Sequence, residues 1–270
     1  MAVNPQSLFL ALAGVHMLDD DRPLSGASIV FVMSRLGVGE SAARSVLQRN
    51  AAKGFIVRRK QGRKTFYTLS ERARGVLREG QEKMFSGWQP QNWDGRWTFV
   101  RVPVPESKRA LRHQLSSRLS WAGFGQVEGG TWVAPGPHDV AGILGEARAE
   151  LTPIAVYGAP QDPTTDQILL DAFDLDELAE RYEAFGRKWA TVGFESQASI
   201  DALGSWESLV RRVELHFDWL TLARTDPQLP AALLPEGWPG AVQGERFREL
   251  STRLEQAESA AIEEFFAGLS

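Results

Sequence analysis

The 270-residue sequence has no cysteine and only four histidines, at positions 16, 113, 138 and 216. Disulfides, cysteine zinc sites and thiol nucleophiles are therefore excluded, and no histidine has an acidic or histidine partner at metal-ligand spacing. A Walker loop, a serine elbow and paired catalytic carboxylates are also missing. These absences predict a protein that is not an enzyme and that holds no metal or cofactor.

Long apolar runs are missing as well. No segment approaches the roughly 20 apolar residues that a membrane span needs, and no basic run precedes the first apolar stretch. The composition, 43% hydrophobic and 24% charged, is that of a folded chain, and the length suits two or three domains. We therefore expect a soluble, cytoplasmic protein that makes no membrane contact.

The net charge of −4 argues against a nucleic-acid binder, but the charge is unevenly distributed. From Arg35 to Arg78 there are twelve Lys or Arg and two acids, a net charge of +10. The remaining residues carry 18 basic and 32 acidic side chains, a net charge of −14. A basic module on an acidic body is expected where only one part of a protein meets phosphate; a solvated basic face is the alternative.

The basic segment has the pattern of a winged helix-turn-helix. Asn4-Pro5 begins a first helix, since Asn is an N-cap and Pro suits the first helical position. Ser25 can cap a second helix, and a third runs from about 40 to 53. The short Gly37-Val38-Gly39 connector between the second and third helices fits the tight turn of a helix-turn-helix.

Two strand-like runs follow, at 55–60 and 65–69, joined by a turn at 61–64 that contains a glycine and two cations. A hairpin with a cationic tip after a helix-turn-helix is a wing: the third helix enters the major groove and the tip reaches phosphates. The side chains expected to contact duplex DNA are Ser41, Arg44, Ser45, Gln48, Arg49, Arg58, Arg63 and Lys64. Docking of the same elements on an acidic partner protein is the alternative.

Residues 37–49, GVGESAARSVLQR, together with 53–56 and 67–72, resemble the N-terminal domain of the PaaX family of phenylacetate repressors, itself similar to GntR-like winged helices. One position departs from the family. Asn50 lies on the apolar side of the third helix, where the family usually has leucine. It either makes a local hydrogen bond near the helix end or changes how the helix sits.

After a polar, turn-rich stretch at 87–92, the middle of the chain alternates strand and helix signals. Strands are predicted at 97–104, 124–127, 131–134 and 154–157, and helices at 106–122 and 140–151. The order βαββαβ is that of a ferredoxin-like domain. Residues 93–100, 109–125 and 130–135 resemble the central PaaX domain, which is similar to the CRISPR adaptation nuclease fold. A metal-dependent nuclease is disfavoured, because Val102-Pro103-Val104-Pro105 stands where such nucleases carry an aspartate.

Beyond Asp162-Pro163 the chain becomes acidic, with helical spacing at 176–189, 206–224 and a last helix ending near 266. The proline-rich segment at 226–240 again resembles PaaX. The expected fold is thus α+β and multidomain: a winged helix-turn-helix over 1–86, a ferredoxin-like domain over 87–160 and a helical C-terminal domain over 161–270.

Because the resemblance spans nearly the whole chain, it implies a transcriptional repressor of a catabolic operon, released by an aromatic acyl-CoA such as phenylacetyl-CoA. The phosphates of such an effector need Arg or Lys side chains, placed beside a pocket with an aromatic lining. The candidates are Trp93, Arg96, Trp132, Trp189, Arg211 and Arg212. Two winged helices on a pseudo-palindromic operator require a homodimer. A protein-interaction module and an acyl-CoA-binding enzyme are the remaining alternatives.

Overall fold

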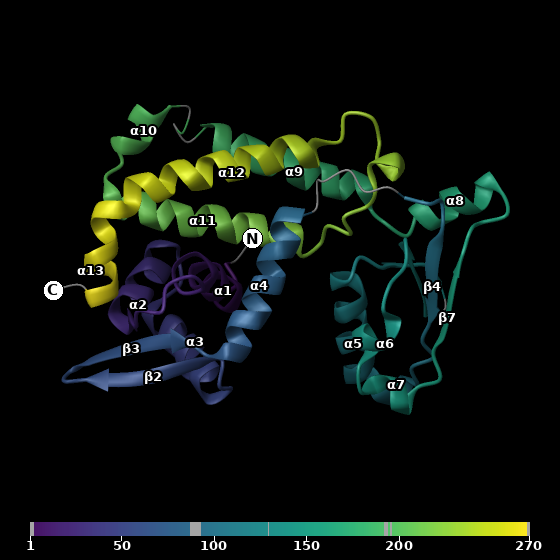
Figure 1. Cartoon of the computed structure of the whole chain (residues 1–270), viewed down its shortest axis with the longest axis horizontal. Helices are drawn as coiled ribbons and strands as arrows, with labels where there is room; N and C mark the ends of the chain where they lie inside the picture. The colour runs from purple at the N-terminus through teal and green to yellow at the C-terminus, as the bar shows by residue number, and fades with distance from the viewer. Residues whose placement is uncertain (1–2, 87–92, 129, 192–193, 195, 269–270) are drawn as a thin grey trace. The chain divides into compact units, whose positions relative to one another are not determined.

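The computed structural model describes residues 3–86, 93–128, 130–191, 194 and 196–268. The chain combines α-helices with two antiparallel sheets (Figure 1) and divides into two compact units. Unit 1 contains residues 1–86, 183–223 and 241–270, and unit 2 contains residues 87–182 and 224–240. The segment 161–270 therefore contributes to both units. The stretch at 87–92 lies outside the described residues.

In unit 1, three helices, a small sheet and a fourth helix follow one another. The elements are α1 (Pro5–His16), β1 (Leu24–Ser25), α2 (Gly26–Arg35), α3 (Glu40–Ala52), β2 (Ile56–Gln61), β3 (Lys64–Leu69) and α4 (Glu71–Ser86). The Asn4 side chain accepts hydrogen bonds from the backbone N–H groups of Gln6 and Ser7, and Pro5 occupies the first turn. The predicted start of α1 is therefore confirmed. The strand β1, which the sequence did not predict, pairs with β3 beside the hairpin.

The C-terminal half of the chain adds helices to the same unit. They are the end of α9 (Leu175–Thr191), α10 (Gln197–Asp201), α11 (Ser205–Ala223), α12 (Pro239–Glu258, from Ala241 on) and α13 (Ile262–Ala267). Figure 1 shows α11, in green, lying across the purple N-terminal helices, with α12 on its other side. Thus helices some 200 residues later in the sequence complete the N-terminal module.

A single hydrophobic core holds these distant segments together. Leu8, Phe9 and Leu12 of α1 are fully buried and share one cluster with Ile29 and Met33 of α2. From the C-terminal half, the same cluster includes Leu209, Val210, Val213, Ala261, Phe265 and Phe266. Since burying a large apolar side chain contributes about 1.5–3 kcal/mol, α11 and α13 are part of the N-terminal module's stability.

A buried group of ionisable side chains crosses this core. Arg212 of α11 bonds Glu258 of α12, and His16 of α1 lies 3.8 Å from the same carboxylate. His216, one turn beyond Arg212, is hydrogen-bonded to Ser251 at 2.8 Å. Burial raises the pKa of Glu258 to about 7. Burial, with Arg212 nearby, lowers the pKa of His216 to about 3 and that of His16 well below its usual value.

Unit 2 contains a four-stranded sheet. Its elements follow in the order strand, helix, strand, strand, two short helices, strand: β4 (Trp97–Arg101), α5 (Arg109–Trp121), β5 (Gly125–Gln126), β6 (Thr131–Pro135), α6 (Val140–Leu144), α7 (Ala147–Glu150) and β7 (Ile154–Gly158). The strand order is β5-β6-β4-β7, with antiparallel neighbours throughout. The single helix predicted at 140–151 is interrupted because Gly145 adopts a positive φ of 56° and ends α6.

The two faces of this sheet are packed differently. Val100, Trp132 and Ala134 join a cluster with Leu115 and Leu119 of α5. On the opposite face, Trp97 and Val133 pack with Leu169 of α8 (Pro163–Leu170) and with Phe173. The alternation of side chains along each strand therefore serves two layers. In the described part of the chain, the helices lack the length or the apolar character that crossing a membrane requires.

Phe265→Ala should lower the free energy of unfolding of unit 1 by about 3–5 kcal/mol, the usual cost of removing a buried aromatic side chain. Phe265 has no exposed surface and lies in edge-to-face contact with His16 and Trp206. Urea unfolding followed by tryptophan fluorescence measures the change. Val242→Ala is the control, since Val242 is 59% exposed; equal losses in the two variants would contradict the shared core.

Stability should fall as the pH is lowered below about 6.5, because the unfolded chain protonates His16 and His216 while the folded chain keeps them neutral. Between about pH 7 and 4.5 the folded chain binds a proton at Glu258 that the unfolded chain does not bind, because the pKa of Glu258 is raised. This stabilises the folded chain as the pH falls and offsets the destabilisation that one of the two histidines contributes. His216→Gln should reduce the slope of unfolding free energy against pH by about 1.4 kcal/mol per pH unit. Urea titrations at pH 7, 6 and 5 test this, and an unchanged slope would contradict it.

Candidate nucleic-acid interface

The turn between α2 and α3 is short and tightly bonded. Gly37 has a positive φ of 85°, which favours glycine. The N–H of Val38 donates to the carbonyl of Met33 at 3.0 Å, and the Val38 side chain is buried. The chain then re-enters a helix at Glu40. This turn holds α3 at a set angle to α2, with one of its sides facing solvent.

The helix α3 has one buried and one exposed side. Ala43, Val46, Leu47 and Asn50 are buried against the core. Of the predicted DNA contacts, Ser41, Arg44, Gln48 and Arg49 are exposed and Ser45 is half-buried. Arg44 pairs with Glu40 at 3.3 Å, and the Ser45 hydroxyl donates to the carbonyl of Ser41 at 2.8 Å. The structure thus presents these side chains together on the outer side of the helix.

The hairpin β2–β3 continues the basic surface. Its strands pair from Ile56↔Leu69 to Gln61↔Lys64, so that Gly62 and Arg63 form a two-residue loop, with Gly62 at a positive φ of 59° as such loops require. Every residue of β2 after Ile56 is exposed. The predicted contacts Arg58 and Arg63 are therefore both accessible.

Two further cations belong to this surface and were missed from the sequence. Arg59 and Lys60 are as exposed as Arg58. Because side chains on a strand alternate between the two faces of the sheet, only some cations of a consecutive run are expected to face the DNA. Because β2 is an edge strand whose residues are exposed on both faces, all three cations reach solvent. The run Arg58-Arg59-Lys60 was the signal in the sequence from which all three exposed cations could have been predicted.

Some of the cations counted in the basic segment are bonded within the fold. Lys64 donates to the carbonyls of Ala267 and Gly268, at 3.4 and 3.3 Å, where α13 ends. Arg74 is buried, bonds the carbonyls of Met17 and Leu18 and pairs with Asp21. Cations near a helix C-terminus stabilise its free carbonyls. Lys64 therefore ties the hairpin to the C-terminal helix.

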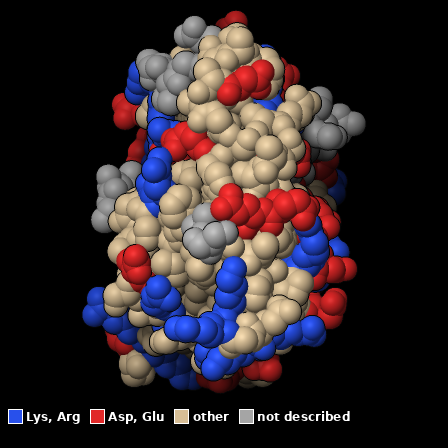
Figure 2. Space-filling view, turned by 90° about the vertical axis from the view of Figure 1, so that its left-hand side faces the viewer, with Lys and Arg blue, Asp and Glu red and all other residues tan. Residues whose placement is uncertain are grey.

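The remaining cations still form a strongly positive surface. Besides the residues of α3 and β2, exposed positive side chains are Lys53, Arg63, Arg72 and Arg78. Arg35 and Lys64 are exposed as well, but Arg35 is paired with Glu207 and Lys64 with the carbonyls at the end of α13. Figure 2 shows Lys and Arg gathered at the lower end of the view, where the β2–β3 hairpin lies, with Asp and Glu mostly above them. Such a surface attracts a polyanion and releases counterions on binding.

A partly buried amide pair, formed by the buried Asn50 and the half-buried Gln6, positions α3. Asn50 donates to the side-chain oxygen of Gln6 at 2.9 Å and accepts from its amide at 3.2 Å. Asn50 also donates to the carbonyl of Val46, one turn earlier. The local hydrogen bond considered from the sequence is therefore present, and a reciprocal bond to α1 accompanies it. Both bonds restrain the rotation of α3 about its axis.

The six candidate effector residues fall in both compact units. Trp93, Arg96 and Trp132 belong to unit 2, and Trp189, Arg211 and Arg212 to unit 1. In unit 2, Trp93 donates to the carbonyl of Arg96 at 2.8 Å, while Arg96 is exposed. Trp132 lines a cavity of about 320 Å³, together with Phe124, Phe173, Gln126 and Arg181. Their role in binding an effector stays a prediction.

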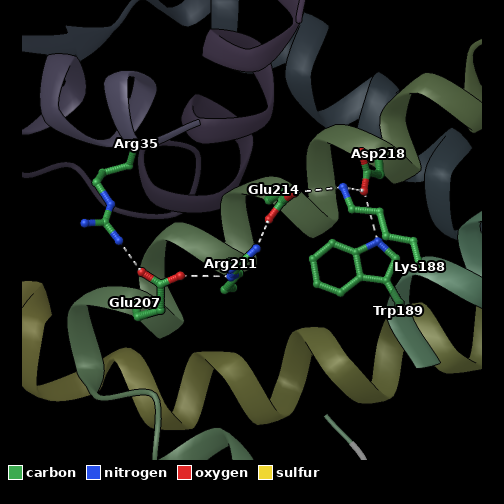
Figure 3. A network of polar contacts seen from close by, with 7 residues as sticks. All are labelled: Arg35, Lys188, Trp189, Glu207, Arg211, Glu214 and Asp218. Carbon is green, nitrogen blue, oxygen red and sulfur yellow. Dashed lines mark hydrogen bonds and ion pairs between the residues drawn. The ribbon is translucent and has the colours of Figure 1, made fainter. Parts of the chain in front are cut away.

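In unit 1 the corresponding side chains form ion pairs and hydrogen bonds (Figure 3). Arg211 bridges Glu207 at 2.9 Å and Glu214 at 2.8 Å, and Trp189 donates to Asp218 at 3.0 Å. Arg212 pairs with Glu255 and Glu258. The Trp189 and Arg212 contacts join α11 to α9 and α12, whereas those of Arg211 lie within α11. Cationic groups that are already bonded to carboxylates are poor receptors for phosphate.

The network of ion pairs in Figure 3 extends to α2, the helix that precedes α3. Glu207, at its first end, bonds Arg35 of α2 at 2.7 Å, and Lys188 of α9 bonds Glu214 and Asp218 at 2.8 and 2.7 Å. Charges of opposite sign thus alternate from α2 along α11 to α9. Within the described residues, groups of three or more His, Asp or Glu side chains able to hold a metal ion are not found.

Comparison with known proteins assigns the chain to a family. Three family models match: the PaaX-like protein at residues 4–73, the PaaX central Cas2-like domain at 90–157 and the PaaX-like C-terminal domain at 173–264. The transcriptional repressor PaaX of Escherichia coli (strain K12) is 25% identical over 250 residues, covering 88% of this chain and 76% of that protein. An uncharacterised protein from Mycobacterium tuberculosis has a similar fold, with a TM-score of 0.57, 22% identity and coverage of 86% and 89%.

The basic module and these relatives define a transcriptional regulator rather than an enzyme. The chain belongs to the PaaX family. The resemblance found in the sequence is confirmed.

Asn50→Ala should lower the free energy of unfolding by about 1–3 kcal/mol, because it leaves the half-buried Gln6 amide without its partner. A Gln6→Leu/Asn50→Leu double variant, which removes both polar groups, should recover much of that loss. Urea unfolding measures both. Gln48→Ala, an exposed position on the same helix, should stay within about 0.5 kcal/mol of the parent; a similar loss there would contradict the role of the amide pair.

Proposed function

We propose that the protein is a DNA-binding transcriptional repressor whose residues 1–86 form a winged helix-turn-helix. The observation that carries the proposal is the outer side of α3, with Arg44, Gln48 and Arg49 exposed and the cationic edge of β2 in the same module. A helix is the element that fits the major groove, where Arg pairs with guanine and Gln with adenine. The hairpin takes the place of a wing on the phosphates.

The charge balance supports the same assignment. The segment from Arg35 to Arg78 has a net charge of +10 and the rest of the chain −14, so a duplex is attracted to one face and repelled elsewhere. Similarity to the repressor from Escherichia coli supports repression rather than activation. A bound dimer on a pseudo-palindromic operator near a promoter would exclude polymerase.

The other parts of the proposal concern unit 2 and the effector. The strand order β5-β6-β4-β7 with βαββαβ connectivity supports a ferredoxin-like central domain. The effector follows from the family resemblance: an aromatic acyl-CoA such as phenylacetyl-CoA that releases the repressor from the DNA of a catabolic operon. The cavity beside Trp132 is lined by the aromatic side chains of Phe124 and Phe173, which suit an aromatic group. Its one cation, Arg181, is paired with Glu177 of the same lining, so the support from this cavity concerns the aromatic group and not the phosphates.

Genomic footprinting of the full chain, followed by titration of the footprinted duplex with phenylacetyl-CoA, tests the proposal. We expect specific binding that weakens steeply with salt and is lost as the thioester is added. By linkage, DNA should weaken thioester binding by the same factor. Binding that does not depend on salt, or the absence of a footprint, would contradict the proposal that the protein is a repressor. Either result would favour a protein-interaction module.

Arg49→Ala should weaken binding to the footprinted duplex by about 1–3 kcal/mol if it pairs with a base, and change little on unrelated DNA. Arg63→Ala, at the hairpin tip, should weaken all duplexes alike and reduce the salt slope by about one. Arg63 is a cleaner probe of the wing than Lys64, which also bonds α13. Fluorescence anisotropy at several salt concentrations measures both effects. Arg148→Ala, an exposed arginine of α7 in unit 2, is the control and should match the parent.

A further inference from the structure

The strand β7 is an open edge of the sheet in unit 2. It pairs with β4 on one side, from Ile154↔Arg101 to Gly158↔Trp97, and ends the strand order β5-β6-β4-β7. In an antiparallel sheet the backbone N–H and C=O groups of alternate residues point to opposite sides. The outer side of β7 therefore presents hydrogen-bonding groups that another strand can use.

The side chains of β7 are exposed on both faces of the sheet. Ile154 and Val156 are 60% and 57% exposed on one face, and Tyr157 is 40% exposed on the other, beside the exposed Ala155. These are three of the seven large apolar side chains that are exposed in the described part of the chain. By contrast, Val100 on the neighbouring strand has no exposed surface. The helices that bury β4 do not bury β7.

The residues of the strand itself provide none of the usual protection against association; charged side chains beside it are Asp94, which accepts from the Tyr157 hydroxyl at 2.7 Å, and Arg96, near the Tyr157 ring. Natural edge strands are blunted by charged side chains, proline or a bulge. The strand Ile154-Ala155-Val156-Tyr157-Gly158 has no charged residue and no proline, and its register with β4 is unbroken. An apolar, regular and uncharged edge of this kind is a template for an added strand.

The sequence of the strand fits its own copy. In an antiparallel pair related by a two-fold axis through Val156, each Ala155 lies opposite Tyr157 and each Ile154 opposite Gly158. Away from the axis, a large side chain thus meets a small one on each face, and at the axis Val156 meets the Val156 of the second copy. Charge agrees with this, because a charged residue at the axis would face an identical charge, and β7 has none. Isologous contacts of this kind build closed dimers.

We propose that β7 pairs with β7 of a second copy of this chain, centred on Val156, and joins the two sheets into one of eight strands. The choice of a second copy also rests on the proposed function, since an operator with two half-sites takes two winged helices. This interface lies outside the module that contacts DNA. Dimerisation and DNA contact can therefore be tested apart.

Single cysteines test the register, because the chain has no cysteine of its own. In the proposed pair the two Val156 Cα atoms lie about 4.5–5.5 Å apart, within the range of a disulfide. Two copies of Ile154 would lie about 14 Å apart, four residues along the strand and one strand across. Under mild oxidation of the full chain, Val156→Cys should form covalent dimers and Ile154→Cys should not. Val242→Cys, equally exposed in unit 1, is the control; Val156→Cys that crosslinks no faster than this control overturns the proposal.

Charge at the axis tests the interface without a crosslink. Val156→Lys should raise the dimer dissociation constant by about a hundredfold or more, because it opposes two like charges, whereas Val242→Lys should leave it unchanged. Mixing Val156→Lys with Val156→Glu should restore dimers through the opposite charges. Analytical ultracentrifugation of the full chains measures this, with far-UV circular dichroism to show that the variants are folded. A parent chain that is monomeric, or a Val156→Lys variant as dimeric as the parent, overturns the proposal.

A duplex with one half-site separates this inference from the proposed function. Val156→Lys should bind it like the parent, since its α3 and hairpin are unaltered. If the parent binds no duplex but Val156→Cys crosslinks, the repressor proposal fails and the dimer stands. If the parent binds the half-site and Val156→Cys does not crosslink, the β7 dimer proposal fails and the repressor proposal stands.

Discussion

The structure of unit 1 depends on the packing of α11 and α13 against the N-terminal helices. The side chains of Leu8, Phe9 and Leu12 are fully buried in a cluster that also contains Leu209, Val213 and Phe265. A three-helix module with a small hairpin has little apolar area of its own. The C-terminal helices supply the missing layer, so that the segment expected to read DNA and the end of the chain share one core. This shared core makes the orientation of α3 a property of both halves of the sequence.

Within that core, polar contacts decide how the helices are aligned. Apolar packing is tolerant of small rotations, whereas a buried hydrogen bond is costly to break. The Gln6 to Asn50 pair orients α3 against α1, and the Arg212 to Glu258 pair joins α11 to α12. The network from Arg35 to Lys188 extends the same alignment from α2 to α9 (Figure 3). The helix α9 contributes residues to both units, and the network meets this helix at Lys188.

Exposed charge is distributed unevenly over the surface of the molecule. Most cations of the basic segment stay exposed on α3 and the hairpin, while Arg35 and Arg74 are bonded within the fold. The acidic remainder keeps other surfaces away from a polyanion. In unit 2 the surface is of another kind, with the uncharged edge of β7 exposed on both faces. Unit 1 thus presents an exposed cationic surface on α3 and the hairpin, and unit 2 presents an exposed strand edge without charged residues.

Local signals in the sequence determined most of the elements. The Asn4-Pro5 cap, the glycine turn before α3, the hairpin with Gly62 and the alternation in β4 each act over a few residues, and the structure has the corresponding elements at these places. The helical pattern also placed the exposed side of α3 correctly, because a period of 3.6 separates Ala43 and Val46 from Arg44 and Gln48. The family resemblance rested on the same local residues.

Tertiary structure alone decided which distant residues share an environment. Contacts between residues that are far apart in the sequence leave no periodic trace in it. For this reason neither the joining of α11 and α13 to the N-terminal core nor the partner of Asn50, 44 positions away, was predictable. Long cationic side chains reach several partners, and folding selected carboxylates for Arg211 and Arg212 and helix carbonyls for Lys64. The exposure of both faces of β7 likewise depends on where the helices of unit 2 end, which the strand's own five residues do not encode.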